Sequence, residues 1–219
     1  MLSNFQIELE KIKDKVTDIG NGVLEANTLL LSALEDCEAE KFNTAKNHIK
    51  NIGAKTDEID NDLIKVLALY SPEARDLRKV IAYLKITNEL SRASSNTRSF
   101  IKGFTDVCTD VDVNMIKEYA VPMQTSTVKA IKLSIDMIYC EDKDEVQELY
   151  NDVLIEESKT DDLYEIVERS LTERAGEVET FEKFHRMLKA LRKSGKIAAR
   201  AISIANLLVY AKVGGNFSS

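Results

Sequence analysis

Apolar residues recur every three or four positions through most of the chain, which predicts helices that each bury one face. In the first helix, Gly20 and Gly22 each cost about 1 kcal/mol relative to alanine, unless a neighbouring backbone packs closely there. Only eight glycines and two prolines occur in 219 residues, so few positions break a helix. The first stripe comprises Phe5, Leu9, Ile12, Val16, Ile19, Val23, Ala26 and Leu30.

A second helix is predicted over residues 41–70, and a third follows directly. Ser71 is expected to cap the third helix, with Pro72 at the first helical position, where its missing N–H costs nothing. This helix is expected to end near Gly103, and residues 105–113 to form a short acidic connection.

The pattern then begins again with three more helices. The fourth is predicted to run to about Cys140, with a kink at Pro122, because proline lacks an N–H. The fifth continues through Leu171. The sixth is predicted from near Glu177 to Val213, closed by Gly214 and Gly215, with a stripe of Phe181, Phe184, Leu188, Leu191, Gly195, Ala198, Ile202, Ala205 and Val209.

A shift of about 101 residues superposes the two halves and keeps the helix order. The sequence therefore predicts an all-α fold of two tandem three-helix bundles, six long helices in all, with repeat 1 at 1–104 and repeat 2 at 105–219. The matching pairs include Asp60 with Asp161, Val66 with Val167, Ser71 with Thr172, Lys85 with Arg186, and Ile101 with Ile202.

Charge and cysteine usage narrow the class of protein. The net charge is −7, with acids and bases interleaved, which argues against a nucleic-acid partner because that would need a basic face or stripe. No apolar stretch reaches the roughly twenty residues of a membrane span, and no signal peptide is expected. Cys37, Cys108 and Cys140 are expected to be reduced thiols in a cytoplasmic protein.

Enzymatic chemistry is poorly supported by the residues. Glu182 and His185 have the Glu-x-x-His spacing of di-iron carboxylate bundles, which need a second such motif and two further glutamates. The other histidine, His48, follows Ala45 and cannot complete the set. We therefore expect a solvated pair at the edge of the core, and no enzyme.

The segment Leu69-Tyr-Ser-Pro-Glu-Ala-Arg-Asp-Leu-Arg78, followed by Val80-Ile-Ala-Tyr-Leu-Lys-Ile-Thr-Asn-Glu-Leu90, carries the most specific local sequence. Together with the duplication, it resembles the PhoU family of bacterial regulators of phosphate uptake and signalling. The resemblance implies a PhoU-like pair of three-helix bundles, homodimeric and cytoplasmic. It also implies contacts with a phosphate ABC transporter and its sensor histidine kinase, and no catalytic step.

The family resemblance also implies metal sites, from which this sequence departs. PhoU-like proteins carry Glu-x-x-x-Asp on the third helix of each repeat, facing acidic residues on the second helix, so that four carboxylates meet. Here the third-helix positions are Ser91 and Ser95 in repeat 1, and Arg192 and Lys196 in repeat 2. The second-helix positions retain Thr56, Asp57 and Asp60 in repeat 1, and Glu157 and Asp161 in repeat 2.

We therefore expect no cofactor, with a weak divalent-metal site at Asp57 and Asp60, or at Glu157 and Asp161, as the remaining candidate. In repeat 2 we hypothesise that Arg192 and Lys196 pair with Glu157 and Asp161 in place of a cation; the alternative is four unrelated solvated charges.

The run Arg75, Asp76 and Arg78 has two interpretations. It forms a surface for a partner protein or phosphate group, or it ties the third helix to its neighbours. The sequence thus favours a non-enzymatic regulator of phosphate transport or signalling that acts by protein contacts. The alternatives are a metal-binding, ferritin-like helical protein and an accessory protein of an ion-coupled phosphate transporter.

Overall fold

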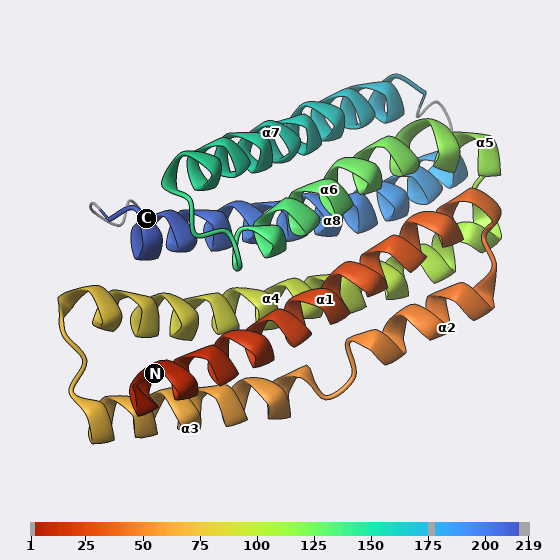
Figure 1. Ribbon diagram of the computed structural model, residues 1–219. Helices are drawn as coiled ribbons and strands as arrows, with labels where there is room; N and C mark the ends of the chain where they lie inside the picture. The colour runs from red at the N-terminus through yellow and green to blue at the C-terminus, as the bar shows by residue number, and fades with distance from the viewer. Residues whose placement is uncertain (1–2, 175–177, 215–219) are drawn as a thin grey trace.

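The computed structural model describes residues 3–174 and 178–214, and these residues fold almost entirely into helix (Figure 1). No strand occurs within these two ranges, as the helical periodicity predicts. The bounds are α1 Asn4–Asp36, α2 Ala39–His48, α3 Ile52–Tyr70, α4 Ala74–Asp110, α5 Val113–Met115, the π-helical turn η1 Ile116–Ala120, α6 Val121–Asp136, α7 Lys143–Arg174 and α8 Val178–Lys212.

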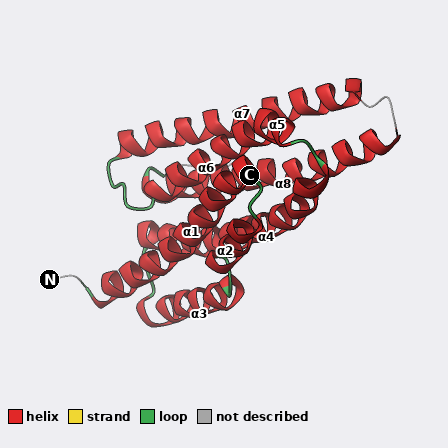
Figure 2. Ribbon diagram, turned by 90° about the vertical axis from the view of Figure 1, so that its right-hand side faces the viewer, coloured by secondary structure: helices red, strands yellow, loops and turns green. Residues whose placement is uncertain are grey.

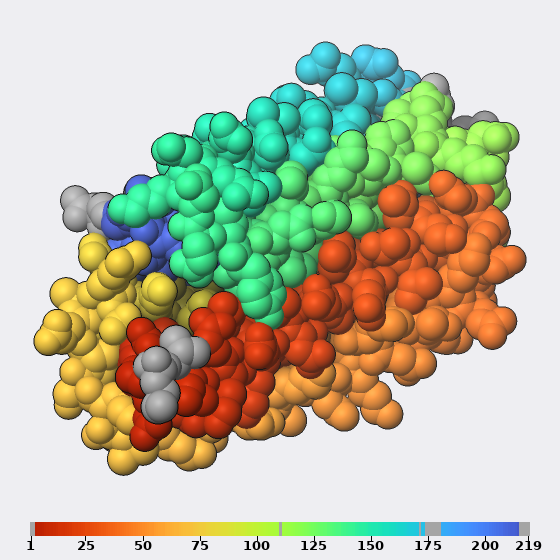
Figure 3. Space-filling model, in the orientation of Figure 1, coloured from red at the N-terminus to blue at the C-terminus, as the bar shows by residue number. Residues whose placement is uncertain are grey.

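Helices α4 and α8 lie side by side and join the two halves of the molecule (Figure 1 and Figure 2). Helices α1 to α3 pack with α4, and α6 and α7 pack with α8. Helix α1 also packs along α6, and Figure 3 shows these two surfaces in direct contact. One hydrophobic core therefore runs through both halves. The all-α bundle architecture is confirmed, whereas the repeat boundary at 104/105 stays a prediction.

The first predicted helix is confirmed as α1, and its apolar stripe is buried throughout. Ser3 caps it reciprocally with Gln6: the Gln6 N–H donates to Ser3 Oγ, and the Ser3 N–H donates to Gln6 Oε1. A close backbone contact explains the glycine at position 22. A Cβ there would lie 2.7 Å from the backbone oxygen of His48, so the close backbone approach that could justify a glycine is present.

The second predicted helix, over 41–70, is wrong as a single element. The chain breaks between α2 and α3, where Asn51 takes a left-handed conformation with φ 61°. Asparagine tolerates that conformation better than most residues. The break lets the end of α2 turn in against α1, where His48 Nδ1 lies 2.6 Å from Glu25 Oε2.

The predicted limits of the third helix are also wrong. Ser71 takes a left-handed conformation that ends α3, with φ 43°, and Glu73 is the N-cap of α4. At its other end α4 continues past Gly103 to Asp110, because Phe104 and Val107 extend the buried stripe. The expected acidic connection over 105–113 is therefore mostly helix.

The later helices follow the predictions more closely. The distortion expected at Pro122 appears as the π-helical turn η1 just before it, consistent with the missing proline N–H. Helix α6 ends at Asp136 rather than near Cys140, and the predicted start of the sixth helix at Glu177 lies outside the described residues. From Leu191 onward the stripe of α8 alternates between buried and half-buried positions, whereas Phe181 is 53% exposed.

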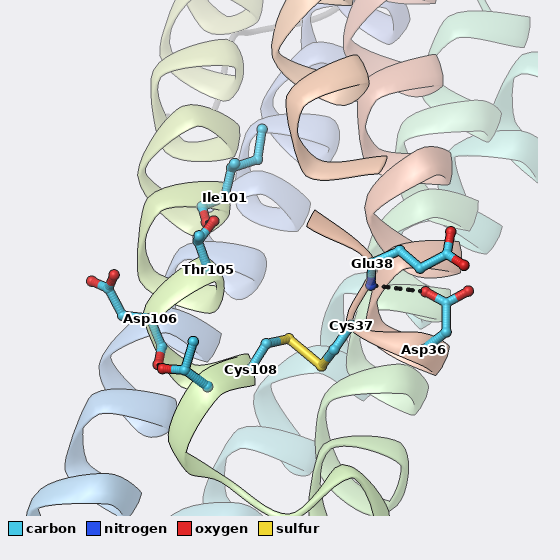
Figure 4. The surroundings of a disulfide bond; sticks show 8 residues. Asp36, Cys37, Glu38, Ile101, Thr105, Asp106 and Cys108 are labelled. Carbon is cyan, nitrogen blue, oxygen red and sulfur yellow. Dashed lines mark hydrogen bonds between the residues drawn. A yellow bond between two sulfur atoms is a disulfide. The ribbon is translucent and has the colours of Figure 1, made fainter. Parts of the chain in front are cut away.

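The expectation of three reduced cysteines is wrong for two of them. Cys37 and Cys108 form a disulfide with a Cα–Cα separation of 5.6 Å, joining the end of α1 to the last turn of α4 (Figure 4). Cys140 is a free, half-buried thiol. The pair was not recognisable in the sequence because 71 positions separate the two residues, and only the packing of α1 against α4 brings them together.

A chain of polar side chains crosses the core between the two halves. Asn27 of α1 donates to Thr97 Oγ1 of α4 at 3.0 Å, and Gln124 of α6 donates to Asn27 Oδ1 at 3.1 Å. Ser194 of α8 donates to Gln124 Oε1 at 2.8 Å and lies 2.8 Å from the hydroxyl of Thr127. All five side chains are buried, so the network fixes the register in which four helices meet.

Candidate functional site

The four repeat-2 positions meet in one groove between α7 and α8. Glu157 and Asp161 lie one turn apart on α7, and Arg192 and Lys196 lie one turn apart on α8. The groove has a volume of about 270 Å³ and is otherwise lined by Met123, Tyr164, Gly195 and Ala199. The helix register inferred from the sequence thus brings all four side chains to the same place.

These four charges do not form the direct ion pairs that we hypothesised. Within the described residues, no side-chain nitrogen of Arg192 or Lys196 comes within 4.0 Å of a carboxylate oxygen of Glu157 or Asp161. Burial raises the pKa of Glu157, and the charge of Asp161 raises it further. Burial raises the pKa of Tyr164, and the charge of Glu168 adds to this. The positive charge of Arg192 partly offsets the increase.

In repeat 1 the corresponding positions are weaker ligands. Thr56 is buried and its hydroxyl donates to the carbonyl of Gly53 at 2.7 Å. Burial raises the pKa of Asp60, the neighbouring charge of Asp57 adds to this, and one buried oxygen of Asp60 accepts no hydrogen bond. Ser91 is half-buried and Ser95 is exposed, so neither supplies a charge.

A polynuclear metal site needs several carboxylates or histidines converging on one point. Among the residues that the structure describes, no three His, Cys, Asp or Glu side chains are grouped to hold a metal ion. Each site offers a pair of carboxylates and no more, because the facing helix carries hydroxyls or cations. The donor set therefore does not fit the metal cluster implied by the family resemblance.

Glu182, His185 and His48, the residues considered for a di-iron site, do not form such a site in the described structure. Glu182 and His185 are both exposed, and the imidazole of His185 stacks on Phe181 with ring centroids 5.9 Å apart. His48 lies on α2, where its Nδ1 is 2.6 Å from Glu25 Oε2. The Glu-x-x-His spacing on α8 therefore has no histidine partner in the described structure.

The residues of the run 75–78 differ in their surroundings, so the structural interpretation and the partner-surface interpretation apply to different side chains. Arg78 is half-buried, and its guanidinium lies beside Gly214 at the end of α8, where a Cβ would be 3.5 Å from Nη1. A cation at a helix C-terminus is favourable, so Arg78 fits the structural interpretation. Arg75 is exposed, and Asp76 lies half-buried in the first turn of α4.

Sequence reasoning missed a cationic surface, which we call the basic groove. It consists of two adjoining hollows along α4 and α8 that share Ser99 and Lys102. The cations come from α2, α4 and α8, so no local sequence run signals them. They are Lys46, Arg98, Lys102, Arg186, Lys189 and Lys193.

Hydropathy adds one finding about the described helices: none has an apolar run of the length and purity that a membrane crossing requires.

The PhoU domain model matches residues 16–101, from the first half of α1 into α4. This segment corresponds to the first predicted repeat and includes the 69–90 segment on which the resemblance rested. No curated protein matches the chain by sequence.

Solved structures extend the similarity to nearly the whole chain. PhoU from Pseudomonas aeruginosa is 21% identical, with a TM-score of 0.85 over 97% of this chain and 100% of that one. The phosphate transport system regulatory protein PhoU from Streptococcus pneumoniae is 18% identical, with a TM-score of 0.82 over 99% and 100%. A PhoU-like protein from Shewanella oneidensis is 16% identical, with a TM-score of 0.64 over 92% and 96%.

The chain therefore has the PhoU fold, and its residues 16–101 match the PhoU domain model, in line with the resemblance seen in the sequence.

Proposed function

We propose that this chain is a non-enzymatic regulator of phosphate transport and phosphate signalling that acts through contacts with other proteins. The observation that carries the proposal is the match to PhoU structures over nearly the full length of both chains, one of them a phosphate transport system regulatory protein. The PhoU domain at residues 16–101 supports it independently.

The partners belong to the same proposal. By its similarity to PhoU, the chain acts in the cytoplasm as a homodimer on a phosphate ABC transporter and its sensor histidine kinase. Surface chemistry suits protein contacts: Ile64 and Leu69 on one side, and Ile155 and Ile166 of α7 on the other, are each more than half exposed. Exposed apolar side chains of this kind favour association with another protein surface.

The disulfide bears on the proposed location. Disulfides are rare in the reducing cytoplasm, so the Cys37–Cys108 bond counts against a cytoplasmic location, which rests on the similarity to PhoU alone. The packing of α1 against α4 brings the two cysteines together.

Gene deletion in the source organism tests the function. In phosphate-rich medium, the deletion strain is expected to keep taking up labelled phosphate and to keep a phosphate-starvation reporter active, while the parent strain shuts both down. The wild-type gene should restore the shutdown. A chain carrying Leu30→Asp should not, because Leu30 is fully buried and an unpaired charge there disrupts the core.

Two outcomes would contradict the proposal. Uptake and reporter activity that respond normally to phosphate without the gene would remove the regulatory role. Deregulated uptake that requires a sodium or proton gradient and not ATP would instead favour an accessory protein of an ion-coupled carrier.

A further inference from the structure

The basic groove runs where α4 and α8 lie side by side (Figure 2). Its first hollow, of about 350 Å³, is lined by Lys102, Arg186, Lys189 and Lys193, together with Ser99, Gly103, Asp106 and Ala190. The second hollow adds Lys46 and Arg98. Asp106 is the single acidic side chain among these lining residues.

Helix periodicity and one close contact create the groove. Arg98 and Lys102 are four residues apart on α4, and Arg186, Lys189 and Lys193 are spaced by three and four on α8, so each set shares one helix face. Gly103 lets the helices approach, because a Cβ there would lie 2.9 Å from the Cβ of Ala190. The two cationic rows therefore flank a shared floor of small residues.

The charges of the groove are largely uncompensated. Among the described residues, Lys46, Lys102, Lys189 and Lys193 form no ion pair with a carboxylate within 4.0 Å. Other lysines of the chain are neutralised: Lys15, for example, lies within 2.7 Å of both Glu58 and Asp62. Like charges four residues apart on a helix destabilise it by a few tenths of a kcal/mol, so folding alone does not favour this arrangement.

We propose that the basic groove docks an acidic amphipathic helix of a partner protein. A third helix seated along α4 and α8 would pack against both of them at the usual interaxial distance of about 8–10 Å. Carboxylates at its i and i+4 positions would face the cationic rows, which have the same spacing. This inference rests on the proposed function, because it names the surface and the chemistry of one regulatory contact.

Charge and shape favour this occupant over other anions. The chain carries 37 acidic and 30 basic residues, so a long polyanion such as a nucleic acid would be repelled beyond the groove. A single phosphate ion could engage one or two of these cations, most of which are exposed, and would leave most of the hollow unfilled. An anionic membrane is flat and reaches the rim of a groove better than its floor.

Binding of a synthetic peptide tests the proposal. The probe is a fluorescent amphipathic helix of about 18 residues, roughly five turns, with Glu on one face, and the matched probe has Gln in place of Glu. Binding is followed by anisotropy at an ionic strength of about 0.15 M, where charges more than about 8 Å apart are screened. The test protein is the full chain carrying Lys102→Glu and Lys189→Glu.

The matched control carries Lys117→Glu and Lys143→Glu, which change the net charge equally at exposed sites outside the groove. We expect the Glu peptide to bind the wild type and the control alike, and the groove variant at least about tenfold more weakly. The Gln peptide should not bind. Circular dichroism and thermal unfolding would establish that all three proteins fold.

Several results would overturn the docking proposal. One is absence of binding to the Glu peptide, and another is equal binding by the groove variant. A third is stronger, groove-dependent binding to inorganic phosphate or to phosphatidylglycerol vesicles, which would assign the groove to a small anion or a membrane. The proposed function fails by a different readout, phosphate uptake in the deletion strain, so the two failures are distinguishable.

Discussion

The pKa of Glu157 distinguishes two arrangements of the repeat-2 groove, one with a direct ion pair to Arg192 or Lys196 and one without. Burial raises its pKa and the charge of Asp161 adds to this, and among the described residues no cation lies within 4.0 Å of its carboxylate. A direct ion pair with Arg192 or Lys196 would have the opposite effect on this carboxyl. The sequence predicted that these four residues meet, but the spacing of residues on each helix could not reveal how far apart their side-chain ends lie.

Replacing Glu157 with Gln is expected to raise the thermal stability at pH 7.5. The folded-state pKa lies above the ordinary value of 4.5, so the ionised carboxylate disfavours the folded state above the raised pKa, and the penalty vanishes below the ordinary value. The gain in Tm should therefore shrink toward zero as the pH falls to about 4. Glu165→Gln, an exposed position on α7, serves as control. A lower Tm for Glu157→Gln at pH 7.5 would indicate an ion pair instead.

At the scale of the element, hydrophobic periodicity predicted which segments are helical but not where several of them end. The stripe of α1 needed no correction because every member faces the core. The break at Asn51 and the left-handed Ser71 depend on how α2 and α3 pack against α1 and α4, which periodicity does not encode. The basic groove was missed for the same reason, since its cations lie on helices distant in sequence.

The glycines test this packing. Gly22→Ala is expected to destabilise the fold by about 1–3 kcal/mol, because its Cβ would meet the His48 backbone oxygen at 2.7 Å. Gly53→Ala, with no atom within 4 Å of the added Cβ, is expected to stabilise α3 by about 0.5–1 kcal/mol. Urea unfolding measures both. Equal gains in stability from the two substitutions would mean that α2 does not lie against α1 as described.

At the scale of the molecule, two halves with little sequence in common form one core. Buried hydrogen bonds among Asn27, Gln124 and Ser194 join α1, α6 and α8. Separation of the halves would expose apolar side chains of the shared core to water. When oxidised, the Cys37–Cys108 bond restricts the unfolded chain further, an effect of about 4 kcal/mol for a loop of this length. Periodicity predicted the helices that build this core, and only their three-dimensional packing reveals the links between them.

The whole molecule thus has the PhoU fold, while the positions where the family resemblance implies metal ligands carry serines in one repeat and cations in the other. We propose that this scaffold acts by protein contact and not through a bound metal cluster. A matched variant sharpens the claim: Arg192→Glu with Lys196→Asp would place four carboxylates around the repeat-2 groove, next to Glu157 and Asp161.

Metal content per chain after gentle purification without chelators, measured by inductively coupled plasma mass spectrometry, tests the claim most directly. We predict that the wild-type chain carries far less than one equivalent of iron or any other divalent metal, while the Arg192→Glu, Lys196→Asp variant gains metal under the same conditions. A wild-type chain that retains one equivalent or more would contradict the account.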